Sequence, residues 1–205
     1  MNRTAISAAA VIALVLGGVC RGDSWPNPTP RIFSSDDGHW AIKIVPERDG
    51  SQKRDFTAVG ILFGLNDDGS ERVAWKRQLV NVPVRAIPYR NYDTAFVVTL
   101  DTWGRMGYEH ALAIYGKEGK LLGDFRLEDL LTEREIRDFA VLSTSSRRWE
   151  NRASFHLVRD PRNPRLRIEF DFGKVLLVDL STGGILDSAK GQTATEQTRP
   201  SQDNG

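Results

Sequence analysis

Residues whose types suit ligand binding are concentrated between positions 101 and 110, in the stretch DTWGRMGYEH. An aromatic ring such as Trp103 or Tyr108 can stack on a sugar ring or on a partner's side chain, while charged neighbours supply hydrogen bonds. The alternative interpretation is structural: Trp103 folds back onto the sheet, and the glycines of the loop only permit the turn. The candidate ligand-binding residues are Asp101, Trp103, Arg105, Tyr108 and Glu109, with Trp149 from a second loop.

The residue pattern gives less support to catalysis. The sequence contains no Gly-x-Ser-x-Gly nucleophile elbow. Asp101 and Glu109 could act as a carboxylate pair for glycoside cleavage, but a β protein of this size contains such pairs by chance. No catalytic residue is therefore predicted, and a hydrolase with a site built from distant loops is the least favoured interpretation.

Metal and cofactor binding are not predicted either. The three histidines, His39, His110 and His156, do not lie at metal-ligand spacing. Asp67 and Asp68 precede a glycine but lack the further alternating oxygen ligands of a calcium loop. No phosphate-binding glycine loop is present.

The first 22 residues have the pattern of a secretory signal peptide. Arg3 precedes an uncharged, mostly apolar run from Ala5 to Val19, and small residues follow this run. A membrane-spanning helix needs about 20 apolar residues, so we expect cleavage, no membrane span in the mature protein, and a secreted or periplasmic location. Lipidation of Cys20, the single cysteine, is an alternative, although Val19 stands where a lipoprotein signal has a small residue.

The composition divides the rest of the chain into three segments. Residues 23–31 contain three prolines and are expected to form an extended linker. Residues 32–186 are expected to form one β-repeat domain, and residues 187–205, which include no aromatic residue, a disordered tail. The 28 basic and 27 acidic side chains leave no basic excess of the kind that nucleic-acid-binding proteins show, so nucleic acid is not an expected partner.

Apolar residues that alternate with a period of two predict an all-β fold. One segment departs from this period: residues 127–139 have helical spacing, and Thr132 with Glu135 forms a capping box, which predicts one or two short helical turns. The rows expected to form strands lie at Trp40–Ile44, Thr57–Leu65, Val73–Leu79, Phe96–Leu100, Leu112–Ile114, Leu121–Leu127, Leu166–Phe172 and Val175–Leu180.

The strands group into about three repeating units. Each unit is expected to open with a polar turn, at Ser34–Trp40, Arg90–Phe96 and Ser143–Trp149, and to close on a hairpin with a glycine, at Gly69, Gly119 and Gly183. Spacings of roughly 50–65 residues match four-stranded propeller blades with insertions. Because closed propellers have at least four blades, the units are expected to form a sandwich-like stack, a small barrel, or an incomplete propeller that pairs with another chain.

Four segments carry a resemblance: Ser35–Gly38, Val97–Trp103 with Gly107 and Tyr108, Leu127–Leu131, and Ser145–Trp149. With these segments the chain resembles uncharacterised secreted bacterial proteins with propeller-like β repeats. The resemblance implies an envelope or extracellular location and propeller-like structure. It implies no activity and no functional residues.

We therefore expect a secreted or envelope-associated, non-catalytic β-repeat module that binds a protein or an envelope component. The alternative is a glycan-binding module that uses the 101–110 loop. Homo-oligomers are compatible with either function, since an incomplete propeller leaves sheet faces open.

Overall fold

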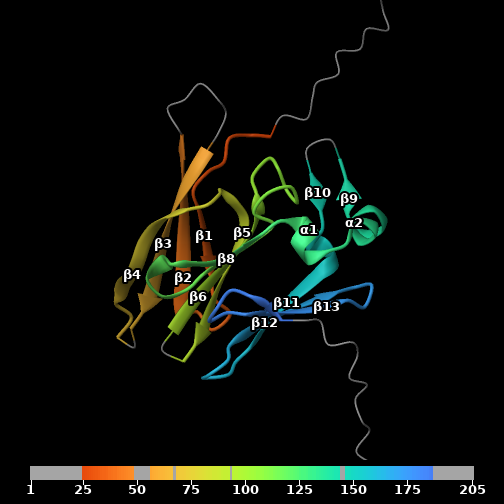
Figure 1. Ribbon diagram of the computed structural model, residues 1–205. Helices are drawn as coiled ribbons and strands as arrows, with labels where there is room; N and C mark the ends of the chain where they lie inside the picture. The colour runs from red at the N-terminus through yellow and green to blue at the C-terminus, as the bar shows by residue number, and fades with distance from the viewer. Residues whose placement is uncertain (1–24, 49–55, 67, 93, 144–145, 187–205) are drawn as a thin grey trace, which may run out of the picture.

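The computed structural model of this chain describes residues 25–48, 56–66, 68–92, 94–143 and 146–186. The expected signal peptide, Cys20 and the expected C-terminal tail lie outside the described residues. The described residues form three four-stranded antiparallel sheets and one two-stranded sheet, with two short α-helices (Figure 1). The predicted all-β fold is confirmed.

Each four-stranded sheet is a meander of four consecutive strands. The first contains β1 (Arg31–Ser34), β2 (Trp40–Arg48), β3 (Phe56–Leu65) and β4 (Glu71–Leu79). The second contains β5 (Pro83–Asn91), β6 (Thr94–Thr102), β7 (Leu112–Tyr115) and β8 (Leu121–Phe125). The third contains β11 (Ala153–Val158), β12 (Arg165–Phe170), β13 (Val175–Asp179) and β14 (Ile185–Leu186).

The sheets stack with the second sheet in the middle, as their colours show in Figure 1. One face of the middle sheet packs on the first sheet in a cluster that includes Trp40, Trp75 and Tyr115. Its other face packs on the third sheet and the helices in a cluster that includes Leu112, Ile136 and Ile168. Accordingly β6 is buried on both faces, with seven of its nine residues buried. The described residues form no closed ring of sheets.

The glycine hairpins lie at the predicted positions. Gly69, Gly119 and Gly183 each join the third strand of a sheet to its fourth, and each has a positive φ. The third opening turn was predicted in the wrong place, because the turn equivalent to those after β1 and β5 lies between β11 and β12, at residues 159–164. Ser143–Trp149 instead overlaps a separate hairpin of β9 (Val141–Leu142) and β10 (Arg147–Arg148).

The predicted apolar row of β3 faces away from the core. The buried positions of this strand are Ala58, Gly60, Leu62 and Gly64, which alternate with the row Thr57–Leu65. Large indole rings explain this choice of face. A Cβ atom on Gly60 would lie 3.2 Å from the ring of Trp75, and one on Gly64 would lie 3.1 Å from the ring of Trp40. The glycines therefore make room for these two rings in the core.

The helical exception is confirmed. It consists of α1 (Leu127–Leu130) and α2 (Glu133–Phe139), which lie at the edge of the stack in Figure 1. The Thr132 hydroxyl accepts a hydrogen bond from the backbone N–H of Glu135, whose carboxylate accepts the N–H of Thr132 at 2.8 Å. This capping box satisfies N–H groups that begin a helix without an internal partner. No helix among the described residues is long and apolar enough to cross a membrane.

Candidate functional site

The 101–110 loop joins β6 to β7 and is held closely against the sheet. The N–H of Trp103 donates to the carbonyl of Val82 at 2.8 Å, and the Thr102 hydroxyl donates to the carbonyl of Glu109 at 2.9 Å. Four positive φ angles shape the loop and its ends, at Asp101, Gly104, Gly107 and His110. A loop with this many internal bonds has little freedom to close over a ligand.

Asp101 and Trp149 lie inside the protein, which corrects their assignment as ligand-binding residues. Asp101 is fully buried, and only 1% of Trp149 is exposed. The Trp149 ring packs edge-on against Phe155, with 5.9 Å between ring centroids. Its indole N–H donates to Oδ1 of Asp101 at 3.0 Å. Neither side chain can stack on a sugar or hydrogen-bond to one in this arrangement.

The surroundings of the Asp101 carboxyl group favour its uncharged, protonated form. Burial raises its pKa from 3.8 to about 7; the neighbouring Glu150 carboxyl group also raises it, while the hydrogen bonds from Trp149 and Gly107 lower it. Oδ2 of Asp101 and Oε2 of Glu150 are both buried and receive no hydrogen bond from a described donor. A proton on one of these carboxyl groups would give the pair a hydrogen bond, because two ionised carboxylates can only accept.

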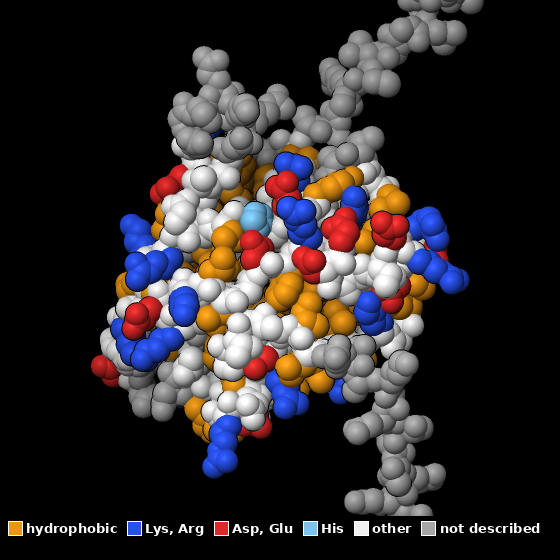
Figure 2. Space-filling view, in the orientation of Figure 1, with side chains coloured by type: hydrophobic (Ala, Val, Ile, Leu, Met, Phe, Trp, Pro, Cys, Tyr) orange, Lys and Arg blue, Asp and Glu red, His pale blue; other side chains and the backbone are white. Residues whose placement is uncertain are grey.

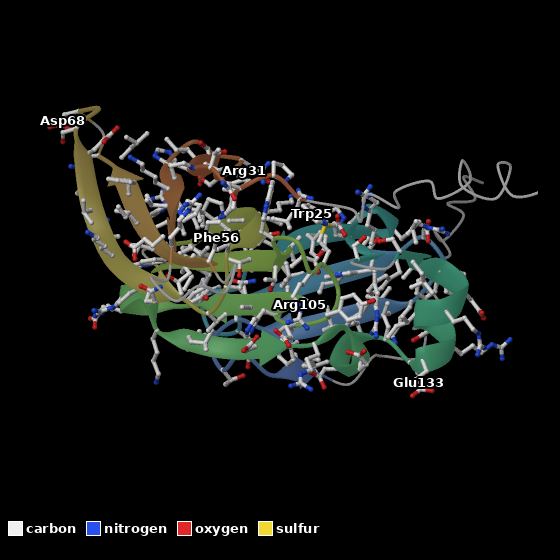
Figure 3. The ribbon with its side chains drawn as sticks, turned by 90° about the horizontal axis from the view of Figure 1, so that it is seen from above. Trp25, Arg31, Phe56, Asp68, Arg105 and Glu133 are labelled. Atoms are coloured by element: carbon white, nitrogen blue, oxygen red, sulfur yellow. The ribbon has the colours of Figure 1, made fainter. Side chains whose placement is uncertain are left out.

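Trp103 folds back onto the first two sheets. Its ring packs against the core cluster that lies between those two sheets. It also meets Trp25 edge-on, with centroids 5.4 Å apart, and donates its indole N–H to the carbonyl of Pro26 at 2.9 Å. The Arg31 guanidinium lies 5.6 Å from its ring centroid, and Figure 3 shows Trp25 and Arg31 on the same side of the molecule. These contacts favour the structural interpretation of Trp103.

The remaining loop residues contribute a small polar surface. The Arg147 guanidinium lies over the Tyr108 ring, 4.3 Å from its centroid, and so occupies one face of that ring. Arg105 and Glu109 form an exposed ion pair with 3.4 Å between Nη2 and Oε1. Of the six predicted residues, these two retain mainly solvent-facing side chains. No described group of three or more His, Cys, Asp or Glu side chains converges as metal ligands would.

Sequence reasoning missed a cleft of about 260 Å³ on another part of the molecule. It lies where the turn after β1, the end of β5 and the end of β11 come together. Only the turn was noticed in the sequence, as a polar strand opening, because the three segments are far apart along the chain. The lining residues are Ser35, Asp36, Asp37, Pro88, Tyr89, Arg90, Phe155, His156, Leu157 and Arg159.

A second feature that the sequence did not reveal is the outer face of the first sheet, the side that points away from β5–β8. Neighbouring strands place Phe63 between Ala41 and Val73, and Ile61 between Lys43 and Lys76. At the two edge strands, Ile32 is 66% exposed and Val73 is 60% exposed. The apolar side chains of this face, called the outer apolar face below, are Ile32, Ala41, Val45, Val59, Ile61, Phe63 and Val73.

Comparisons with protein-family models, curated proteins and solved structures find no match to this chain. The resemblance to secreted propeller-like proteins therefore stays a hypothesis, and functional inference rests on the cleft and the outer apolar face.

Proposed function

We propose that this chain is a secreted or periplasmic, non-catalytic binding module that docks another protein against the outer apolar face. The observation that carries the proposal is the composition of that face. Its central strands contribute Val45, Val59, Ile61 and Phe63, which are not among the side chains that pack on the core. Contiguous exposed apolar surface of this kind marks interaction sites in soluble proteins.

The rest of the stack supports this proposal. The middle sheet buries both of its faces, one against each neighbouring sheet. Among the described residues, the first sheet is covered on one side only, yet its other side also carries a row of aliphatic and aromatic residues. A partner that lays an apolar sheet or helix on this face would add the missing layer, at about 25 cal/mol per Å² of apolar surface buried.

The charges on the face define the partner's chemistry. Lys43 and Lys76 flank Ile61 in one row across the sheet. A matching partner surface would be apolar and would carry carboxylates opposite these two ammonium groups.

A second copy of this chain fits the face less well. A two-fold contact would bring the lysines of both copies to the same interface. The outer side of the third sheet also carries cations, Arg165 and Arg167, with the exposed His156 next to them in register. Like charges would therefore oppose either arrangement.

The alternatives have less support. Glycan binding by the 101–110 loop has less support because two of its predicted contact residues, Asp101 and Trp149, are buried in the core. A hydrolase requires a cleft with several titratable groups, and the cleft at Tyr89 supplies them. However, among the described lining residues the hydroxyl nucleophile besides Tyr89 is Ser35, whose Oγ is hydrogen-bonded to Asp37 and to the backbone of Trp40 within its own turn.

Site-specific photo-crosslinking in the cells that produce the protein tests the proposal. A photoreactive phenylalanine derivative replaces Val73 and, as a control, Val158, which is 41% exposed on the outer side of the third sheet. We expect one discrete adduct with another protein from position 73 and none from position 158. The adduct should disappear when Ile32→Lys is added, with an unchanged melting temperature.

Two results would overturn the proposal. Equal crosslinking at both positions would mean that the outer apolar face is not a specific site. An adduct between two copies, with a sedimentation mass that halves in the Ile32→Lys variant, would identify the face as a self-assembly interface instead.

A further inference from the structure

The cleft at Tyr89 is formed by three segments, one from each four-stranded sheet: the turn after β1, the end of β5, and the end of β11 with the residue that follows it. The turn that follows β1 supplies Asp36 and Asp37, β5 supplies Tyr89 and Arg90, and β11 with its following residues supplies His156 and Arg159. The stacking of the sheets thus brings the three segments to one place. Among the described strands, β5 and β11 are each hydrogen-bonded along one edge, which leaves the other edge to line the cleft.

The cleft contains polar side chains without a hydrogen-bond partner among the described residues. The side chains of Asp36 and Arg159 make no hydrogen bond or ion pair with another described residue, although both line the cleft. Asp37, in contrast, caps its own turn by accepting from the Ser35 hydroxyl at 2.6 Å and from the His39 N–H at 3.2 Å. Of these unpaired side chains, Asp36 is a hydrogen-bond acceptor from the turn after β1, and Arg159 is a donor that follows β11.

Tyr89 adds a buried hydroxyl to this set. Only 6% of the residue is exposed, and its hydroxyl oxygen has no hydrogen-bond partner among the described residues. Burial, with a smaller contribution from the charge of Asp36, raises the pKa of Tyr89 well above its usual value, so the group stays a neutral hydroxyl. A buried polar group without a partner is unfavourable, so a ligand hydroxyl or a water molecule that reached this oxygen would offset that cost.

The geometry points to a neutral sugar as the ligand of this cleft. Two carboxylate residues, Asp36 and Asp37, and two guanidinium residues, Arg90 and Arg159, line the cleft, so a ligand with a net charge of either sign would meet repulsion as well as attraction. A sugar hydroxyl both donates and accepts, whereas a carboxylate only accepts and a guanidinium only donates. One ring can therefore donate to Asp36 and accept from Arg159.

The apolar part of the lining fits the same ligand. Pro88, Phe155 and Leu157 supply apolar surface for the C–H groups of a sugar ring. A volume of about 260 Å³ places the cleft just below the range of drug-sized pockets, which is about 300–1,000 Å³, and so favours one or two rings rather than a long chain. This site is separate from the outer apolar face and does not depend on the docking proposed there.

Saturation-transfer NMR on the purified protein, followed by calorimetry, tests the proposal with glucose, galactose, mannose and N-acetylglucosamine. We expect at least one of these sugars to bind. Asp36→Ala and Arg159→Ala should each weaken binding about tenfold, because each removes a charged hydrogen-bond partner. The matched control is Arg167→Ala, an exposed cation in β12 on the outer side of the third sheet, and it should leave the affinity unchanged.

Tyr89→Phe separates ligand binding from folding. It removes the hydroxyl that lacks a partner and keeps the ring, so we expect an unchanged or higher melting temperature together with weaker sugar binding. Absence of a signal with every sugar would overturn the proposal, as would binding that survives both Asp36→Ala and Arg159→Ala. Binding of glycine or another zwitterion in place of the sugars would also overturn it.

Discussion

The indole N–H of Trp149 donates a hydrogen bond of 3.0 Å to Oδ1 of Asp101 across 48 residues of sequence. The same oxygen accepts the N–H of Gly107 at 2.8 Å. One buried carboxyl group therefore orders the loop after β6 and ties it to the segment that leads into the third sheet. The residues that the sequence marks as a binding site are thus used to join two layers of the fold.

Asp101→Ala should destabilise the protein strongly, and Asp101→Asn should not. Alanine leaves the N–H groups of Trp149 and Gly107 buried without an acceptor, at a cost of about 1–3 kcal/mol for each. Asparagine keeps the acceptor and tolerates the φ of 58° that this position adopts. Urea unfolding of both variants measures the difference. Equal losses of unfolding free energy in the two variants would show that the side-chain oxygen at position 101 does not hold the loop.

The raised pKa of Asp101 gives the stability a specific pH dependence. The folded protein holds this proton up to a pH of about 7, whereas an unfolded chain releases it near 3.8. The folded state therefore binds more protons between these values, and the Asp101 contribution to the free energy of unfolding falls as pH rises from about 4 to about 7.

Asp101→Asn removes that titration and is the natural comparison. The difference in unfolding free energy between the variant and the native protein should shift in favour of the variant between pH 4 and pH 7. Urea unfolding at intervals across this range measures it. A constant difference would mean that Asp101 is ionised throughout.

A comparison of two glycines distinguishes the stability cost of backbone strain from the cost of a close contact. Gly107 and Gly173 have φ values of 74° and 89°. A Cβ atom at Gly107 would lie 2.4 Å from the backbone oxygen of Arg147, whereas one at Gly173 would meet nothing within 4 Å. We expect Gly173→Ala to cost about 1–2 kcal/mol from backbone conformation alone and Gly107→Ala to cost clearly more. Chemical denaturation of the two variants side by side gives both values, and similar losses would contradict a close approach of β10 to the loop.

Trp103→Ala should lower stability by about 2 kcal/mol, less than the 3–5 kcal/mol typical of a fully buried aromatic residue. The ring is only partly buried, but it packs on the core and holds the segment at Trp25 and Pro26. Thermal unfolding measures the loss. An unchanged melting temperature combined with lost sugar binding would instead restore the 101–110 loop as a ligand site.

Local chemistry in the sequence was sufficient to predict most of the long strands and the helical segment, but not β1 or β5, which no predicted row includes. The period-two rows predicted strands, Gly69, Gly119 and Gly183 predicted hairpins, and Thr132 with Glu135 predicted the start of α2, because each of these signals acts over a few residues. The same signals predicted about three repeating units, and the three consecutive meanders agree with them.

Only the tertiary structure decided which surfaces are free. The alternation in β3 shows that the strand has two faces but not which one is buried. The face with Gly60 and Gly64 is buried because it leaves room for the indoles of Trp75 and Trp40. Burial of Asp101 depends on Trp149, and the cleft depends on three segments that stacking brings together. The sequence by itself determined most of the strands, the glycine hairpins and the helix cap, since those depend on neighbours along the chain. The buried carboxyl group, the cleft and the outer apolar face arise from contacts between distant segments, which no local pattern records.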